Sequence, residues 1–300
     1  MNRARIEIAK PEVVRYFLTL QKKVFSYQDV EDILSKERDN WKLAKSMSGL
    51  KFLEFLLKES ILKEVRLKFP HRPTKRFISD GASVLEIASS LRQKGYFSHY
   101  SAIQIHGLSK ETSKIIYINE EQNNDNSNNE GLRQDRIDAA FQRPARVSNN
   151  KATIGDTVIC ILNGMNTGGL GVESSTINGI PIRATNVERT LIDAAVRPVY
   201  SGGIHGVLEA YNLAHDKFSP TKLIQIYRTI KYSYPYHQAI GFYMEAVGKY
   251  ALNSIESLLI MPKKFDFYLT HQMEDTKYSK KWRIYYPSYI NELLPEAVKQ

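Results

Sequence analysis

The sequence predicts an α+β protein in which an N-terminal winged helix-turn-helix is followed by a larger mixed α/β domain. Residues 1–80 hold three amphipathic helical segments and then two short strands joined by a basic, proline-containing turn. Those residues include 18 Lys and Arg against 11 Asp and Glu, a net +7 of the chain's +10. Residues 81–300 mix helical and strand patterns. We therefore expect one domain over 1–80 and a second over 81–300.

The composition of the chain indicates which class of partner it binds and in which cellular compartment it is found. A pI near 9.4 favours polyanionic partners over acidic ones. The single cysteine, Cys160, excludes an internal disulfide and fits a reducing, cytoplasmic location. It lies in the apolar run 157–162, so we expect an unreactive core thiol. No apolar run approaches the length of a membrane span. The N-terminus is charged and lacks the apolar region of a signal peptide, so we expect none.

The N-terminal helices are predicted from their apolar spacing. The first begins at Pro11 as a first-turn proline, and its apolar face comprises Val13, Val14, Phe17 and Leu18. The second begins at Ser26, a residue type favoured at the N-cap, and its apolar face comprises Tyr27, Val30, Ile33 and Leu34. A polar connector over 37–45 leads to a third helix from about residue 46, and its buried stripe comprises Leu50, Leu53, Leu56 and Leu57.

The basic residues of this module are the candidate DNA contacts. The third helix has the composition of a recognition helix, whose first residues enter the major groove. Its candidates are Lys42, Lys45, Ser46, Ser48 and Lys51. The turn of the following hairpin would be the wing, which can lie along phosphates or place an arginine in a narrow minor groove. Its candidates are His71, Arg72, Lys75 and Arg76. The alternatives are a solvated charged face, or a winged helix that contacts only proteins.

The second domain is predicted from capping and turn signals. Helices are expected over 84–91, 98–106, 132–141, 185–195, 204–214, 220–229 and 238–247, and strands over 115–118, 157–162, 172–177, 180–184, 265–269 and 282–286. Asn178-Gly179 between apolar runs is a strong hairpin signal. The polar stretch near 120–130 is expected to be a mobile loop. A capping box is expected over 185–188, and Arg189 with Asp193 should form an i, i+4 pair on the helix behind it.

No pattern of residues predicts catalysis. The glycine-rich stretch 164–171 lacks the Gly-Lys-Ser/Thr ending of a P-loop, so a flexible loop is favoured over a phosphate cradle. His99 and His106 lack the other ligands of a metal site. We therefore expect no catalytic residue, no cofactor and no metal, and a protein that is not an enzyme. The alternatives are an enzyme acting on nucleic acid, with the winged helix as its targeting domain, and an adaptor for protein partners.

Several segments carry a family resemblance that covers nearly the whole chain. They are Tyr96-Phe-Ser-His-Tyr-Ser-Ala-Ile-Gln-Ile-His-Gly-Leu108, Ile182-Arg-Ala-Thr-Asn-Val-Glu-Arg-Thr-Leu-Ile-Asp193, Gly202-Gly203, Gly241-Phe-Tyr-Met-Glu245 and a tail strand that contains Trp282. Together with the winged helix, they resemble the AbiEi-type antitoxins of type IV toxin–antitoxin systems. The Asn-rich stretch at 121–129 departs from that pattern.

The resemblance implies both a partner and a role. Family members repress their own operon by binding inverted repeats in double-stranded DNA through the winged helix. The larger domain counters a nucleotidyltransferase-like toxin without forming a stable complex with it. Carried over to this chain, DNA contact falls on residues 42–51 and 71–76, and the resemblance supplies no catalytic residue.

Overall fold

The chain folds into two compact units that are not continuous in sequence. The structure, a computed structural model, describes residues 5–122 and 131–299. Unit 1 comprises Met1–Gln93 and Asn150–Ile159, and unit 2 comprises Lys94–Asn149 and Cys160–Gln300. The predicted α+β class is confirmed, because both units combine helices with sheets. The expected boundary after residue 80 falls inside unit 1, and most of the expected loop near 120–130 lies outside the described residues.

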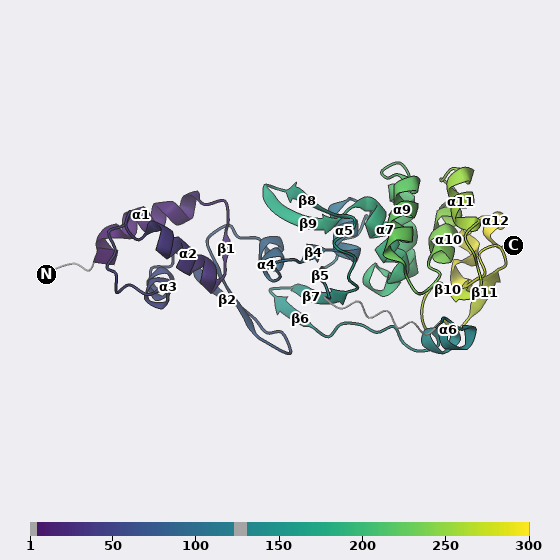
Figure 1. The fold of residues 1–300 in the computed structure, drawn as a ribbon, viewed down its shortest axis with the longest axis horizontal. Coiled ribbons are helices and arrows are strands. Elements are labelled where there is room, and N and C mark those ends of the chain that lie inside the picture. The colour runs from purple at the N-terminus through teal and green to yellow at the C-terminus, as the bar shows by residue number, and fades with distance from the viewer. Residues whose placement is uncertain (1–4, 123–130, 300) are drawn as a thin grey trace. The chain divides into compact units, whose positions relative to one another are not determined.

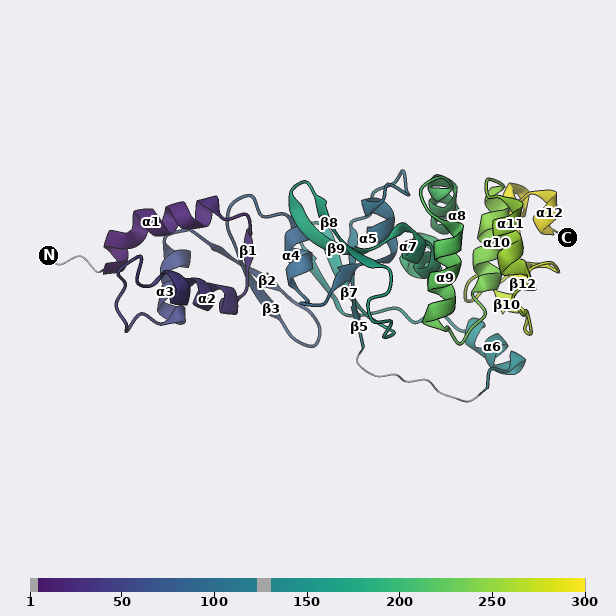
Figure 2. The same cartoon turned by 45° about the horizontal axis from the view of Figure 1, so that its top comes forward.

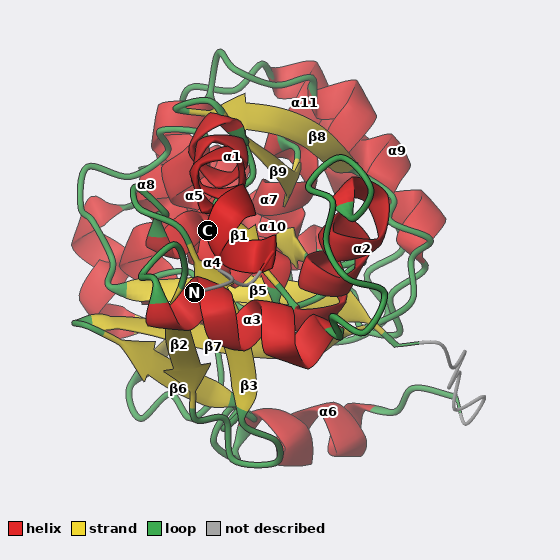
Figure 3. Cartoon of the chain, turned by 90° about the vertical axis from the view of Figure 1, so that its left-hand side faces the viewer, coloured by secondary structure: helices red, strands yellow, loops and turns green. Residues whose placement is uncertain are grey.

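Unit 1 has the element order of a winged helix. Its elements are α1 (Arg5–Thr19), β1 (Val24–Phe25), α2 (Tyr27–Glu37), α3 (Gly49–Lys58), β2 (Lys63–Leu67), β3 (Thr74–Ile78), α4 (Val84–Ser90) and β6 (Lys151–Ile154). Strands β2 and β3 form an antiparallel hairpin, and β1 adds to β3, giving the order β1-β3-β2. Figure 3 shows α1, α2 and α3 with this hairpin.

The second helix of unit 1 begins where its sequence predicts. The Ser26 hydroxyl accepts from the backbone N–H of Asp29, and the Asp29 carboxylate accepts from the backbone N–H of Ser26. This reciprocal capping box satisfies two backbone donors that the helix leaves unpaired. Val30 and Leu34 then point into the core of the unit. The connector after α2, expected to be polar, also contributes the buried side chains of Trp41 and Leu43.

Two predictions on unit 1 were wrong in their helix boundaries and faces. Helix α1 begins at Arg5, so Pro11 lies inside it, where the proline removes one backbone hydrogen bond. The α1 residues that reach the core are Ile6, Ala9, Val13 and Phe17, whereas Leu18 is 68% exposed. Helix α3 begins at Gly49, and Leu50 is 56% exposed. Its buried face instead comprises Phe52, Leu53, Phe55 and Leu56.

Unit 2 contains a mixed sheet, a helical layer and a small second sheet (Figure 1). Its strands are β4 (Tyr96–Phe97), β5 (Ile115–Glu121), β7 (Thr157–Gly164), β8 (Val172–Ile177), β9 (Ile180–Thr185), β10 (Phe267–Tyr268), β11 (Thr276–Ser279) and β12 (Ile284–Pro287). Its helices are α5 (His99–Ile105), α6 (Gln134–Phe141), α7 (Val187–Val196), α8 (Gly203–Ala214), α9 (Pro220–Ile230), α10 (His237–Val247), α11 (Leu252–Leu259) and α12 (Glu296–Lys299), with 3-10 turns η1 (Pro198–Tyr200) and η2 (Ser288–Leu293).

The larger sheet has the strand order β6-β7-β5-β4-β9-β8, and the unit boundary passes through β7. Strand β4 pairs antiparallel with β5 and parallel with β9. The predicted β8–β9 hairpin is confirmed, with Ile177 opposite Ile180. Asn178 and Gly179 between them have φ of 50° and 81°, the left-handed conformation that a tight hairpin turn of this kind requires.

Helix α7 is the centre of unit 2. It contacts α5, α8, α9 and α10, and Figure 2 shows these helices grouped around it. Every residue of α7 from 188 to 195 is buried, including Arg189 and Asp193. The smaller sheet, with the order β10-β12-β11, packs on α10. Trp282, which lies just before β12, also contacts α10, and its indole N–H donates to the Glu245 carboxylate at 2.6 Å.

The contact between Gly241 and Trp282 gives a stability prediction. Alanine is normally about 1 kcal/mol better than glycine inside a helix. A Cβ at Gly241 would lie 2.1 Å from the fully buried Trp282 ring. We therefore expect Gly241→Ala to lower the free energy of unfolding by about 1–3 kcal/mol, measured by urea denaturation of the full chain.

The matched control for this prediction is Gly131→Ala. An added Cβ there meets no atom within 4 Å. The change in the free energy of unfolding should stay within about 0.5 kcal/mol. If Gly241→Ala left the urea midpoint unchanged or raised it, the close packing of α10 on Trp282 would be contradicted.

Candidate functional site

The first candidate site is the basic surface at the start of α3. Ser48 is the N-cap of α3, and its hydroxyl accepts from the backbone N–H of Lys51 at 3.3 Å. Lys42, Lys45 and Lys51 are exposed, and no carboxylate of the described residues pairs with them. The N-terminal end of a helix carries partial positive charge, which adds to the charge of these lysines. We call Lys42, Lys45, Ser46, Ser48 and Lys51 the α3 surface.

The wing adds a second set of basic side chains. His71 and Arg72 are exposed in the turn between β2 and β3, and the described residues offer neither side chain a carboxylate. Lys75 on β3 is paired with Glu64 on β2 at 3.1 Å, and Arg66 also pairs with Glu64, at 2.8 Å. The tip of the wing is therefore more available to a polyanion than the strands that carry it.

Arg76 lies apart from these exposed groups. Its Nε donates to the Ser90 hydroxyl at 3.0 Å, and its Nη2 donates to the Ser90 carbonyl at 2.7 Å. Burial lowers the pKa of its guanidinium. Arg76 therefore ties β3 to the end of α4, so we leave it out of the candidate DNA surface.

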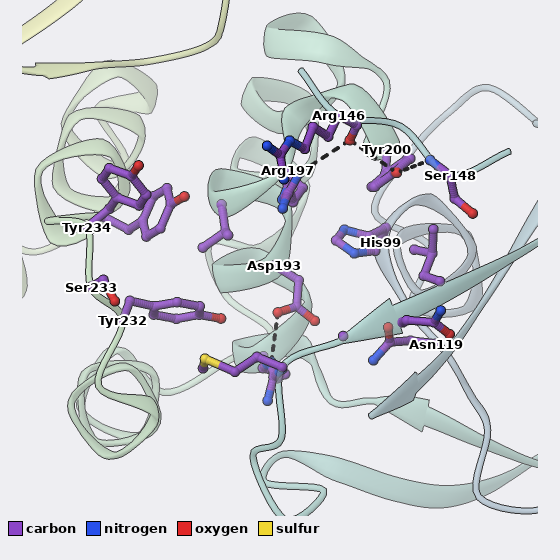
Figure 4. Close-up of a pocket in the computed structure, with 17 residues that line it drawn as sticks. His99, Asn119, Arg146, Ser148, Asp193, Arg197, Tyr200, Tyr232, Ser233 and Tyr234 are labelled. Carbon is purple, nitrogen blue, oxygen red and sulfur yellow. Dashed lines mark hydrogen bonds and ion pairs between the residues drawn. The ribbon is translucent and has the colours of Figure 1, made fainter. Parts of the chain in front are cut away.

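A second candidate site is a pocket of about 540 Å³ inside unit 2. Its wall is built by α7, the end of β7, residues 146–148 and the segment 232–236 between α9 and α10. Figure 4 shows side chains from these segments converging on one space. The charged residues among those that line it are Arg146, Arg189, Asp193 and Arg197. We call this space the α7 pocket.

The base of the α7 pocket holds a buried ion pair. The Arg189 Nε donates to the Asp193 carboxylate at 2.7 Å, which confirms the predicted i, i+4 pair. The Arg189 Nη1 also donates to the Leu170 carbonyl at 2.9 Å. Burial disfavours the charge on Arg189, but the Asp193 carboxylate outweighs that effect and raises its pKa. The positive charge of Arg189 is therefore retained in the interior.

His99 also lines the α7 pocket, and one of its ring nitrogens has no hydrogen-bond partner. The residue is only 9% exposed, and its Nδ1 has no hydrogen-bond partner. Burial lowers the pKa of the ring to about 4, so His99 is neutral at neutral pH. Its backbone has a φ of 51°, which histidine rarely adopts. A strained, buried and unsatisfied side chain of this kind is typical of a binding site.

Arg146 and Arg197 lie together on one side of the α7 pocket (Figure 4). Both are exposed, and among the described residues neither has a carboxylate partner. The Arg197 Nη1 donates to the Arg146 carbonyl at 3.3 Å, which holds the two residues close together. The Tyr200 hydroxyl, accepting from the Ser148 backbone N–H at 2.7 Å, fixes the same segment to η1.

Tyrosines supply another wall of the pocket. Tyr232, Tyr234 and Tyr236 all line it, and their rings contact one another at 5.4 Å and 6.0 Å between centroids. Burial raises the pKa of Tyr236 to about 12 and that of Tyr232 well above its ordinary value. In Figure 4 the Tyr232 hydroxyl points toward Asp193. This wall is therefore neutral and aromatic, and it can offer hydroxyl groups.

The glycine-rich stretch 164–171 is held in place by the protein's own carboxylate. Glu121, the last residue of β5, accepts from the backbone N–H of Thr167 at 2.8 Å and from that of Gly169 at 3.1 Å. It also accepts from the Thr167 hydroxyl. Residues 165–171 form a loop, as predicted, and the Glu121 carboxylate already binds two of its amides. The phosphate-cradle alternative loses its donors for the same reason.

Of two further predictions, the capping box at the start of α7 was wrong and the burial of Cys160 was confirmed. The capping box over 185–188 was wrong, because Asn186 is the N-cap of α7 and accepts from the backbone N–H of Arg189. Glu188 instead accepts from the backbone N–H of Ser219. Cys160 is a fully buried thiol, as predicted.

His99, the first residue of α5, and His106, the residue after α5, do not lie at a common site. The His106 Nε2 is hydrogen-bonded to the Thr185 carbonyl at 2.6 Å, whereas His99 faces the α7 pocket. Across residues 5–122 and 131–299 there is no group of three or more His, Cys, Asp and Glu that could hold a metal ion.

The sequence analysis missed the α7 pocket. Its strongest signal is the run Tyr232-Ser-Tyr-Pro-Tyr236, which concentrates aromatic residues in a connection between two helices. The other members are spread from residue 99 to residue 236 and carry no fixed spacing. The sequence analysis considered the pair at 189 and 193, His99 and the stretch 164–171, but each separately and for another role.

The buried histidines give a prediction for the dependence of stability on pH. His99 and His237 have their pKa lowered by burial from 6.5 to about 4. Below about pH 6.5 these histidines bind protons in the unfolded chain but stay neutral in the folded chain. The free energy of unfolding therefore decreases as the pH falls. Each histidine contributes up to about 3 kcal/mol to this loss. His99→Asn, which tolerates the positive φ, should flatten the decrease in urea denaturation at pH values between about 4.5 and 7.

His205→Asn is the matched control, because His205 is exposed on α8. It should leave the pH dependence as it is in the unsubstituted chain. An equal loss of stability in the His99→Asn variant and in the unsubstituted chain would show that His99 is not buried in its neutral form.

Comparison with known proteins gives a likeness in fold to a solved structure but no match to a family model or to a curated protein. No family model and no curated protein matches the chain. It is similar to the crystal structure of the RV2827C protein from Mycobacterium tuberculosis, with a TM-score of 0.56 and 13% identity over 94% of this chain and 92% of that one. In the part of the chain that the structure describes, no helix combines the length and apolar character needed to cross a bilayer. The likeness supports an α+β fold and, at this identity, says nothing further about the chain.

Proposed function

We propose that this chain is a transcriptional repressor of the cytoplasm that binds double-stranded DNA through unit 1. The observation that carries the proposal is the α3 surface, where Lys42, Lys45 and Lys51 are exposed without a carboxylate partner at the start of the third helix of a winged helix. Lysines in this position are suited to the phosphates that flank a major groove, with the first turn of the helix against base edges.

The wing supports the same proposal. Arg72 and His71 lie at the tip of the β2–β3 hairpin and are exposed. An arginine held on a short, fixed turn can enter a narrow minor groove, where the negative potential is enhanced. The recognition helix and the wing would then contact adjacent grooves of one duplex, and phosphate contacts would supply most of the affinity.

The resemblance to AbiEi-type antitoxins extends the proposal to a biological role. In that role the chain represses its own operon by binding inverted repeats, and unit 2 counters a nucleotidyltransferase-like toxin without a stable complex. We assign the chain no catalytic residue in this role. Co-expression tests it: the chain should restore growth to cells that express a nucleotidyltransferase-like protein from the adjacent reading frame, and failure to do so would reject the antitoxin role while leaving DNA binding open.

The α3 surface gives a prediction that salt titration can test. The triple substitution K42A/K45A/K51A should weaken binding to a duplex from the chain's own upstream region. It should also lower the slope of log K against log salt by about 0.9 for each phosphate contact that is lost. The measurement is fluorescence anisotropy at several salt concentrations, with a random duplex of equal length in parallel.

The matched control is K36A/K58A/K63A, which removes the same charge from exposed positions of unit 1 away from the start of α3. Lys36 and Lys63 already face Glu37 and Asp80, and Lys58 is at the far end of α3. This control should change the salt slope much less. Equal effects of the two triple variants, or no preference for the upstream duplex over the random one, would contradict the proposal.

A further inference from the structure

The α7 pocket has the features of a site for a small ligand. Its volume of about 540 Å³ lies in the range that such ligands occupy. Its lining includes His99, a buried residue whose Nδ1 has no hydrogen-bond partner. A buried polar atom without a partner is unfavourable, and a ligand that donates a hydrogen bond to it would remove that cost.

The charge of the pocket selects an anion. Asp193 is neutralised by Arg189, so the pair contributes no net charge. Arg146 and Arg197 then remain as the charged groups of the lining without a carboxylate partner among the described residues. The guanidinium group of each arginine can donate two hydrogen bonds to the oxygens of a phosphate.

The opposite wall selects a flat aromatic group. Tyr232 and Tyr234 lie across the pocket from His99 (Figure 4), and Tyr236 of the same segment also lines it. Tyrosine rings provide stacking surface for a nucleobase. The neutral His99 and the hydroxyl groups of the tyrosines can pair with the edge of the base.

We propose that the α7 pocket binds a nucleoside phosphate, with its phosphate on Arg146 and Arg197 and its base between His99 and the tyrosines of residues 232–236. The chemistry is shared by a free nucleotide and by the 5′-phosphorylated end of an RNA strand. The site lies wholly in unit 2, so the proposal does not depend on DNA binding by unit 1.

The experiment is isothermal titration calorimetry of the full chain. The probes are ATP, GTP, AMP, GMP, adenosine, guanosine, inorganic phosphate and a 5′-phosphorylated oligoribonucleotide. The oligoribonucleotide is titrated into the K42A/K45A/K51A variant, which removes the competing α3 surface.

We expect saturable binding of at least one phosphorylated probe. Its affinity should be about tenfold or more higher than that of the matching nucleoside or of phosphate alone. Binding of mononucleotides identifies a free nucleotide as the ligand, and binding of the oligonucleotide alone identifies a strand end.

The pocket is tested by R146A/R197A, two exposed residues whose loss should leave the fold intact. This variant should weaken binding about tenfold or more. The matched control R143A/R228A removes two exposed arginines of unit 2 that do not line the pocket, and it should bind like the unsubstituted chain. Thermal melting confirms that each variant is folded.

Three results would overturn the proposal. The first is no saturable binding of any phosphorylated probe at millimolar concentration to the folded chain. The second is binding that R146A/R197A leaves unchanged, or that R143A/R228A weakens equally. The third is inorganic phosphate binding as tightly as the nucleotides, which would leave the aromatic wall without a role.

Discussion

The buried ion pair between Arg189 and Asp193 is the constraint on which the architecture of unit 2 depends. Two charges in the interior are stable only when each satisfies the other and the remaining hydrogen-bonding groups also find partners. Arg189 meets this condition by reaching the Leu170 carbonyl and the Thr167 hydroxyl as well as Asp193. The pair therefore fixes the glycine-rich stretch against α7. Removing one member would leave a charge buried alone, at a cost of about 3–5 kcal/mol.

The close approach of this stretch to α7 explains one of its glycines. At Gly171 the φ is 73°, and a Cβ would lie 2.7 Å from the Arg189 Cβ. A larger residue would push away the segment that carries the Leu170 carbonyl. The same helix also presents Asp193 and Arg197 to the α7 pocket. Packing of the helix and composition of the pocket are thus two results of one arrangement, in which Arg189 and Asp193 line the pocket and Glu188 instead accepts from the Ser219 backbone N–H.

Local signals in the sequence predicted most elements, and tertiary contacts decided the rest. The Ser26 cap and the Asn178-Gly179 turn depend on neighbours within a few residues, so they could be located without a structure. The buried face of α3 could not, because Leu50 and Phe52 are both apolar and only the packing against α2 decides which one is covered. Arg76 has the composition of a wing residue, but Ser90, fourteen residues away, binds its guanidinium. The α7 pocket is assembled from segments far apart in the chain, which no spacing in the sequence relates.

The path of the chain has a consequence for synthesis. Unit 1 takes up residues 150–159, whose strand β6 contacts β2, although its other residues end at Gln93. During translation, the helices and the wing emerge from the ribosome well before this last segment. A nascent chain of about 100 residues would therefore present an incomplete N-terminal unit, which becomes whole only after much of the second unit has also been made. Proteolytic dissection at residue 93 would release the same incomplete module, so its behaviour in isolation would not be that of the intact chain.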